Sequence, residues 1–195
     1  MTSRPLTRAD ILPMEAYARI RDARRREMTA IKQHRRVTVG PDITFYFESF
    51  ETMLHQVHEM LFIEKGGEAQ IEDELRAYGP LIPGGTNLVA TMMIEIDEPG
   101  RRARVLSQLG GVEETVFFEV AGSRVAAVPE GDVERTTPDG KTSSVHFLKF
   151  PFAEEQIAAF RTPGSRILLG IDHSNYAHLA VLPEGVRESL VKDFA

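Results

Sequence analysis

The sequence contains no cysteine. This absence excludes disulfide bonds, thiolate nucleophiles, iron–sulfur ligation by this chain and zinc sites of the cysteine type. No stretch approaches the roughly 20 consecutive apolar residues of a membrane span. No apolar run follows the first arginines, as one does in a secretory signal. We therefore expect a soluble, cytoplasmic protein with no membrane partner.

Several motifs of common enzyme families are also missing. The chain has no G-x-G-x-x-G after a predicted strand and no G-x-x-x-x-G-K-[ST], which weakens the case for a nucleotide-binding fold. It has no H-E-x-x-H metal motif and no nucleophile elbow. No Ser-His-Asp arrangement can therefore be argued from the sequence.

The composition is that of an ordinary globular protein, but the charge is unevenly distributed. The chain has 195 residues, of which 42% are apolar and 27% charged, and we expect one domain over residues 1–195. Residues 1–36 hold ten Lys/Arg and four Asp/Glu, a balance of +6, whereas the other 159 residues hold thirteen against twenty-five, a balance of −12. Either the basic segment packs on the acidic body, or it reaches an acidic partner.

An amphipathic pattern predicts a first helix over residues 14–34. Pro13 suits the start of a helix. Five apolar residues recur at roughly helical spacing, namely Met14, Tyr17, Ile20, Met28 and Ile31. We expect these five to be mostly buried and the Arg24–Arg26 run to face solvent.

The rest of residues 1–80 is also predicted to be mainly helical. Residues 43–47 alternate as a strand does. Ser49 is typical of a helix N-cap. Three further helices are predicted along the chain, over residues 50–65, 68–78 and 184–193.

Two segments of residues 87–195 show the same order of predicted elements. Residues 92–132 and 146–186 each give strand, helix, strand, strand, and each ends on a valine-containing strand before Pro-Glu-Gly. The cause is either chance or a duplication, and a duplication would pair two β-α-β-β units into one continuous sheet. The expected fold class is α+β, with a helical N-terminal part followed by a mainly antiparallel sheet. Residues 129–144 are rich in turn formers and charge, so we expect a flexible loop there.

A cluster of polar side chains follows the apolar run 167–171. This run predicts a central strand, and Asp172, His173, Tyr176 and His178 come directly after it. The end of a buried strand is a common place for a site. Asp172 could orient either histidine as a supporting carboxylate. The alternative is a simple hairpin turn, because Asp, Ser and Asn favour turns.

His146 is predicted on the apolar face of a strand. Such an imidazole needs a hydrogen-bond partner, so it is either a satisfied core residue or a ligand or proton-transfer group. We expect Asp172, His173 and Tyr176 to lie near one pocket, to which His146 or Glu59 contributes.

A polar stripe marks the helix predicted over residues 50–65. Glu48, Thr52, Gln56 and Glu59 follow helical spacing beside its apolar face. Glu48 and Glu59 are about three turns or ~16 Å apart, so they cannot share one metal ion. His55 and Glu59 are one turn apart and either chelate an ion or form a polar flank of the helix.

Taken in order, these segments resemble a bacterial family catalogued only as a domain of unknown function. The resemblance covers nearly the whole chain and rests on a series of short motifs: Leu6, Asp10-Ile11-Leu12, Tyr17, Arg35-Arg36-Val37, Phe47-Glu48, Thr52, Gln56, Glu59-Met60, Pro80-Leu81-Ile82-Pro83, Ala90-Thr91-Met92-Met93-Ile94-Glu95, Ser144-Val145-His146-Phe147-Leu148, Asp172-His173 and Tyr176. Genes of this family often stand near rubrerythrin-like and Fe–S oxidoreductase genes, so the resemblance implies a redox or peroxide-defence setting. The pattern includes neither His55 nor His58. It has proline after Asp-His where this chain has Ser174, which leaves that turn less rigid.

Two functions follow from these observations. The first is a cytoplasmic accessory or binding protein of a redox or peroxide-defence system, whose partner is a rubrerythrin-type or Fe–S protein met through the basic first helix. The second is a non-haem metal-binding protein or metal-dependent enzyme that holds iron, manganese or zinc. Its candidate ligands are Asp172, His173, Tyr176, His178, His146, Glu59 and Glu48. Nucleic-acid binding is disfavoured, because the body is acidic and only Tyr17 could stack near the arginines.

Overall fold

The computed structural model of the chain describes residues 4–131, 136 and 140–195. The centre of the expected flexible loop 129–144 therefore lies, apart from Thr136, outside the described residues. The described helices are α1 (Met14–Gln33), α2 (Phe50–Glu64), α3 (Glu68–Tyr78), α4 (Pro99–Leu106), α5 (Glu154–Arg161) and α6 (Glu184–Leu190), with short 3₁₀ turns η1 (Arg8–Asp10), η2 (Gly79–Leu81), η3 (Val112–Thr115) and η4 (Val191–Asp193). The strands are β1 (Arg36–Val39), β2 (Ile43–Phe47), β3 (Asn87–Ile94), β4 (Val116–Val120), β5 (Ser123–Ala126), β6 (Val128–Pro129), β7 (Val145–Pro151), β8 (Ile167–His173) and β9 (Tyr176–Val181).

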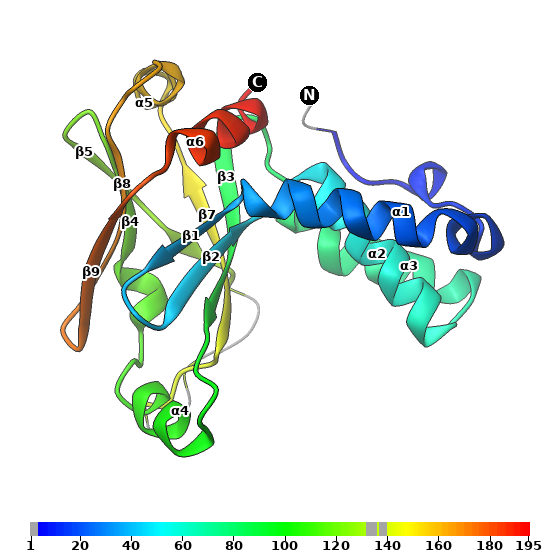
Figure 1. Cartoon of the computed structure of the whole chain (residues 1–195), viewed down its shortest axis with the longest axis horizontal. Coiled ribbons are helices and arrows are strands. Elements are labelled where there is room, and N and C mark those ends of the chain that lie inside the picture. Colours follow the sequence, from blue (N-terminus) through cyan, green and yellow to red (C-terminus); the bar gives the residue numbers. More distant parts are fainter. Residues whose placement is uncertain (1–3, 132–135, 137–139) are drawn as a thin grey trace.

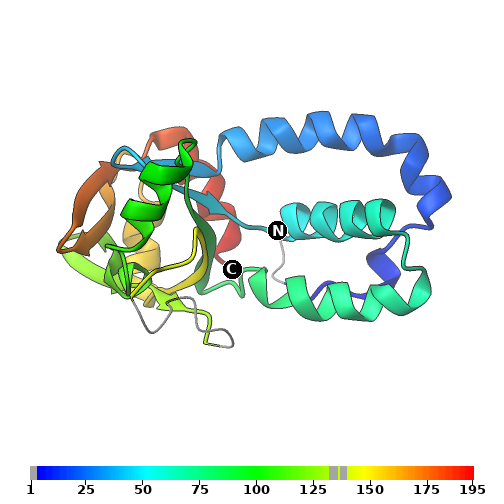
Figure 2. The same ribbon diagram turned by 90° about the horizontal axis from the view of Figure 1, so that it is seen from below.

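The molecule has two visibly different parts. The helices α1, α2 and α3 lie side by side and project from the strands as a helical arm (Figures 1 and 2). We call this part, residues 4–33 and 50–81, the arm, and the remainder the body. In the described part of the chain, no helix has the length and apolar character needed to cross a membrane.

The body consists of two antiparallel sheets that face each other. The first has the strand order β1-β2-β3-β7-β6 and the second the order β5-β4-β8-β9. Buried phenylalanines fill the space between them, and Phe118 meets Phe150 edge-to-face with ring centroids 4.9 Å apart. The expected α+β class, with helices preceding a mainly antiparallel sheet, is confirmed.

The first helix forms as its apolar pattern predicts, with one exception. Tyr17 and Met28 are buried and the Arg24–Arg26 run is exposed, as expected. Met14 and Ile31 are half-buried, but Ile20 is 38% exposed, so its predicted burial is wrong. Only Tyr17 and Met28 of α1 are buried, so the face that this helix buries is narrow and leaves Ile20 outside it.

The second helix begins and ends as the sequence predicts. The Oγ of Ser49 accepts the backbone N–H of Thr52 at 3.3 Å, which confirms the predicted N-cap. α2 ends at Glu64, one residue before the predicted boundary, and its C-cap Lys65 has a left-handed φ of 56°. These end signals fix both the direction and the length of the middle helix of the arm.

The predicted repeat of strand, helix, strand, strand is present, but the strands do not join in one sheet. β3-α4-β4-β5 and β7-α5-β8-β9 follow the same order, and the corresponding strands pair, β3 with β7 and β4 with β8. The expectation of one continuous sheet is wrong, because the second half of each unit lies in the opposite sheet. Each of the two facing sheets covers the apolar face of the other. Two helices of eight residues each are too short to cover the apolar face of one continuous sheet. The superposition of the two units stays a prediction.

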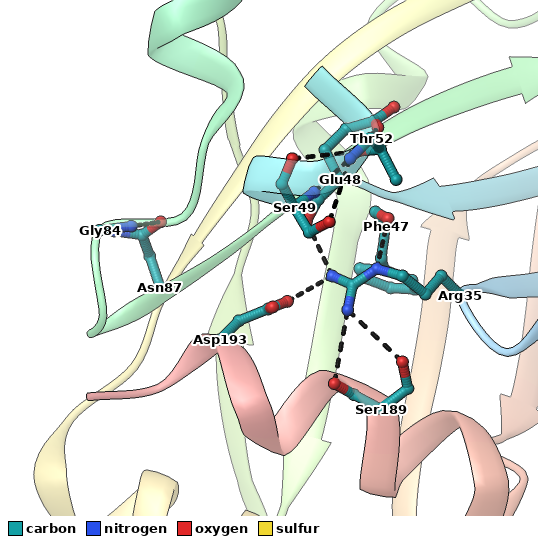
Figure 3. A network of polar contacts seen from close by, with 9 residues as sticks. All are labelled: Arg35, Phe47, Glu48, Ser49, Thr52, Gly84, Asn87, Ser189 and Asp193. Atoms are coloured by element: carbon teal, nitrogen blue, oxygen red, sulfur yellow. Dashed lines mark hydrogen bonds and ion pairs between the residues drawn. The ribbon is translucent and has the colours of Figure 1, made fainter. Parts of the chain in front are cut away.

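A buried arginine joins the arm to the body. Arg35 stands between α1 and β1 and is only 5% exposed. Its Nε donates to Phe47 O at 3.0 Å, and its Nη2 donates to Glu48 O at 2.8 Å and to the carboxylate of Asp193 (Figure 3). Nη1 lies 3.4 Å from Ser189 O at the end of α6. One guanidinium thus ties the base of the arm to the first sheet and to the C-terminal helices.

We expect the Arg35→Met substitution to destabilise the fold by about 3–5 kcal/mol, the range for breaking a buried ion pair. Burial already raises the pKa of Asp193, and the guanidinium opposes that rise, so its loss leaves a buried carboxyl without a counter-charge. Urea denaturation monitored by circular dichroism measures the effect. The matched control is Arg166→Met at an exposed position of the body, which should change stability by less than about 0.5 kcal/mol. Equal stability of the two variants would contradict the role given to Arg35.

Candidate functional site

The polar residues at the end of β8 hold a hairpin together. Asp172 is exposed and pairs with Arg124 at 3.1 Å. The Nε2 of His173 donates to Gly110 O at 3.3 Å, and its Nδ1 accepts the backbone N–H of Asn175 at 3.2 Å. Both nitrogens of this ring are therefore engaged with the backbone.

Tyr176 fastens this hairpin to the opposite sheet. Its buried hydroxyl donates to Val39 O at 2.8 Å and accepts the backbone N–H of Asp42 at 2.9 Å. Burial raises the pKa of Tyr176. Gly40 is required at this contact, because a Cβ on its left-handed backbone would lie 2.6 Å from the hydroxyl. His178 packs its exposed ring edge-on against Tyr176 at 4.5 Å.

His146 and Glu48 lie in two further places. His146 is fully buried, and its Nε2 lies 3.0 Å from Ser143 O, while its Nδ1 is 3.7 Å from a carboxylate oxygen of Glu113. Glu48 is buried where α2 meets β3, and its two carboxylate oxygens accept the hydroxyls of Thr52 and Thr91, each at 2.7 Å. Each group is paired in its own surroundings.

The seven predicted ligands are thus distributed over separate parts of the molecule. Asp172, His173, Tyr176 and His178 share one hairpin, but Glu59 lies on α2 in the arm. No group of three histidine or carboxylate side chains suited to a metal ion occurs among the residues that the structure describes. The chain's described residues therefore offer no ready shell for iron, manganese or zinc.

Glu59 belongs to a polar cluster between α1 and α2. Its Oε1 accepts the hydroxyl of Tyr17 at 2.7 Å and the Nε of Arg21 at 2.8 Å, and its Oε2 accepts a second guanidinium nitrogen at 2.8 Å. The hydrogen bonds of Arg21 lower the pKa of Glu59 to about 2. Burial, helped by the adjacent carboxylate, raises the pKa of Tyr17. A tyrosine, an arginine and a carboxylate thus join the two helices.

His58 holds the N-terminal segment against this cluster. Its Nδ1 donates to Leu54 O at 2.9 Å, and its Nε2 accepts the backbone N–H of Leu12 at 3.0 Å. These two hydrogen bonds require a neutral imidazole ring. Burial lowers the pKa of His58, which also favours the neutral ring. The ring stacks on Tyr17 with centroids 4.6 Å apart.

His55 is the next histidine along the same helix. Its Nδ1 lies 3.4 Å from the Tyr17 hydroxyl, whose own proton is directed to Glu59. The contact therefore places a proton on Nδ1 and leaves Nε2 as an acceptor. Burial lowers the pKa of His55, which favours the neutral ring. His55 and Glu59 therefore both contact the hydroxyl of Tyr17.

A cavity of about 270 Å³ lies beside this cluster. The N-terminal segment, α1 and α2 enclose it, and it is lined by Asp10, Leu12, Tyr17, Arg24, Glu27, Met28, Ile31, Phe50, Glu51, Leu54, His55 and His58. An apolar cavity with a few convergent polar groups and shifted pKa values is the arrangement that usually marks a binding site.

A second hollow of about 430 Å³ lies on the flank of α1, on the other side of Met28 and His55. Its lining is strongly basic and consists of Asp22, Arg25, Arg26, Met28, Thr29, Lys32 and His55. We call it the basic groove. Among the described residues, none of Arg25, Arg26 and Lys32 forms an ion pair with a carboxylate.

The sequence analysis connected Glu59 with His55 on one helix, but it did not connect either residue with Tyr17 or Arg21 of the facing helix. His55 and His58 fall outside the family-like pattern. The sequence signal for this cluster is the helical spacing of Tyr17, Arg21, Arg24 and Met28. This spacing places polar groups on the same side of α1 as buried Tyr17 and Met28. This spacing can be recognised in the sequence, but it identifies a site only when the helix that packs against α1 is known.

We expect Glu59→Gln to lower stability at pH 7 by about 1–3 kcal/mol, because charge-assisted hydrogen bonds to Arg21 and Tyr17 are lost. Folding lowers the pKa of Glu59 from about 4.5 to about 2, so its stabilisation is complete above pH 4.5 and is lost as the pH falls towards 2. The difference in unfolding free energy between wild type and variant should therefore decrease as the pH falls through this range. Urea denaturation at pH 7, 5, 4 and 3 measures it, with the exposed Glu72→Gln as control. A gap that stays constant with pH would contradict the assignment.

A family model and a solved structure each match the chain over nearly its whole length. A family model described as "Protein of unknown function (DUF3501)" matches residues 5–194. The chain is also similar to a solved structure, a novel protein of unknown function from Burkholderia pseudomallei K96243, with 37% sequence identity and a TM-score of 0.91. The match covers 98% of this chain and 100% of that one. Among curated proteins, none matches the chain. This chain, with its helical arm and its two-sheet body, belongs to the DUF3501 family.

Proposed function

We propose that this chain is a cytoplasmic binding protein of a bacterial redox or peroxide-defence system, and that its arm receives an acidic partner protein. The observation that carries the proposal is the basic groove, where Arg25, Arg26 and Lys32 line one hollow without an ion pair among the described residues. The arginines that hold the arm in place are paired instead, as Arg21 and Arg35 show.

The distribution of charge supports an acidic partner. Residues 1–36 carry a balance of +6 and the rest of the chain a balance of −12. An acidic protein is therefore repelled by most of the body and attracted to one side of the arm. Such complementarity raises the association rate and fixes the orientation of a complex.

The shape of the molecule supports the same contact. The arm projects from the sheets, and α1 forms one side of it along its full length (Figure 2). Arg25 and Arg26 lie near the middle of α1 and are exposed. A partner can therefore approach the basic groove without meeting the two sheets.

The partner class follows from the sequence and the family resemblance. The chain has no cysteine and cannot itself ligate an iron–sulfur cluster through thiolates. In a redox system the metal centre then belongs to the partner. The genomic association that the resemblance implies favours a rubrerythrin-type protein, with an Fe–S oxidoreductase as the alternative partner.

We expect an acidic rubrerythrin-type protein from the same bacterium to bind the wild-type chain, and the double substitution Arg25→Glu/Arg26→Glu to weaken that binding at least tenfold. The physical reason is the reversal of two charges in the groove. Calorimetric titration at 50 and 200 mM salt provides the measurement, and higher salt should weaken the wild-type complex.

The control is Arg104→Glu/Arg166→Glu, which reverses two exposed charges of the body and should leave the affinity unchanged. The Fe–S oxidoreductase is titrated in parallel to decide between the two partners. If neither protein binds, or if the groove variant binds as tightly as the control, the proposal is wrong.

A further inference from the structure

We infer that the cavity between the N-terminal segment, α1 and α2 is a binding site for a small, neutral, hydroxylated aromatic molecule. The cavity is distinct from the basic groove, and the inference does not rest on the protein partner. Four observations carry it: the size of the cavity, the chemistry of its walls, the pairing of most of its charged groups, and the hydrogen-bond acceptor of His55.

The size admits one or two fused rings. An apolar cavity of about 150 Å³ inside a protein is large enough to hold benzene. The volume here is about 270 Å³, which suits a bicyclic molecule but lies below the usual range for larger cofactors.

The walls are mainly apolar and partly aromatic. The apolar side chains in the lining are Leu12, Met28, Ile31, Phe50 and Leu54. Tyr17 and His58 also line the cavity, and they are fixed by stacking on each other and by hydrogen bonds at 2.7–3.0 Å. A thioether and several rings around a slot favour a flat aromatic guest.

Three of the charged side chains in the lining already form ion pairs. Arg24 pairs with Glu27 at 2.8 Å, and Asp10 pairs with Arg4 at 2.5 Å. Glu51 lies in the first turn of α2, where the helix dipole favours a carboxylate. Arg24 is the only arginine or lysine of the lining and is already paired, so an anionic guest would lose its hydration without gaining a counter-ion.

His55 supplies the polar contact that orients the guest. Its Nδ1 is turned to the Tyr17 hydroxyl, which leaves the Nε2 of a neutral ring as a hydrogen-bond acceptor on a side chain that lines the cavity. An acceptor recognises a hydroxyl donor on the guest. The class that satisfies all four observations is therefore a phenol or naphthol.

The experiment uses 2-naphthol as the probe, with naphthalene and 2-naphthoate as its matched analogues. We expect saturable binding of 2-naphthol with one site per chain, about fivefold weaker binding of naphthalene, which lacks the hydroxyl, and at least tenfold weaker binding of the 2-naphthoate anion. Probe fluorescence measures the affinity. Chemical shifts of the Met28 and Ile31 methyl groups locate the probe.

Two substitutions test the site itself. Met28→Trp fills the cavity and should weaken 2-naphthol binding at least tenfold. His55→Phe keeps an aromatic ring but removes the acceptor, and should weaken 2-naphthol about fivefold while leaving naphthalene unchanged. Ile63→Trp is the control, because Ile63 is 62% exposed on α2 and lines neither hollow. If Met28→Trp fails to fold, Leu54→Phe takes its place with the same expected loss.

Three results would overturn the inference. These are a lack of saturable 2-naphthol binding, undiminished binding by the folded cavity-filling variant, and 2-naphthoate binding as tight as that of 2-naphthol. Because no protein partner enters this experiment, its failure leaves the proposed function of the basic groove untouched, and the reverse also holds.

Discussion

The position of the arm depends on the burial of one guanidinium group. Arg35 places a full charge between the arm and the body, which is costly unless every donor finds an acceptor. Here the acceptors come from the end of β2, from α6 and from Asp193 in the C-terminal turn. Phe47 and Glu48, which supply two of these carbonyls, directly precede the N-cap of α2. The same contact therefore sets where α1 ends, where α2 begins and how the chain's last helix closes the base.

The arm is built differently from the body, and its hollows follow from that difference. The space between the two sheets is filled by interlocking phenylalanines. The contact between α1 and α2 is made instead by Tyr17, Arg21, His58 and Glu59, whose hydrogen bonds fix directions and distances. Such polar contacts hold two helices in register without filling the space beside them. A cavity and a groove on the two sides of Met28 are the physical result.

The sequence was sufficient for local structure and insufficient for what distant segments do together. α1, α2 and α3 were predictable to within one or two residues, because helical periodicity and the Ser49 cap are local signals. Ile20 was mispredicted because periodicity does not say how wide the contact with the next helix is. The two-sheet arrangement could not be predicted from the sequence either. Alternation of apolar and polar residues shows that a strand has an apolar face, but it does not show which sheet covers that face. The pairing of Glu59 with Arg21 joins residues far apart in sequence, so no spacing rule reveals it.

The motif residues of the family resemblance have a common property in this fold. Arg35 joins the arm to the body, Glu48 joins α2 to β3, Glu59 joins α2 to α1, and Tyr176 joins β9 to the turn after β1. The polar atoms of these residues form the hydrogen bonds that connect the elements. A structural role therefore explains why these residues are part of the pattern, without a catalytic role. Groups that recognise a ligand must instead keep polar atoms for it. In the arm these are the cations of the basic groove and the Nε2 of His55, so the groups proposed to recognise a ligand lie next to these four joints and not at them.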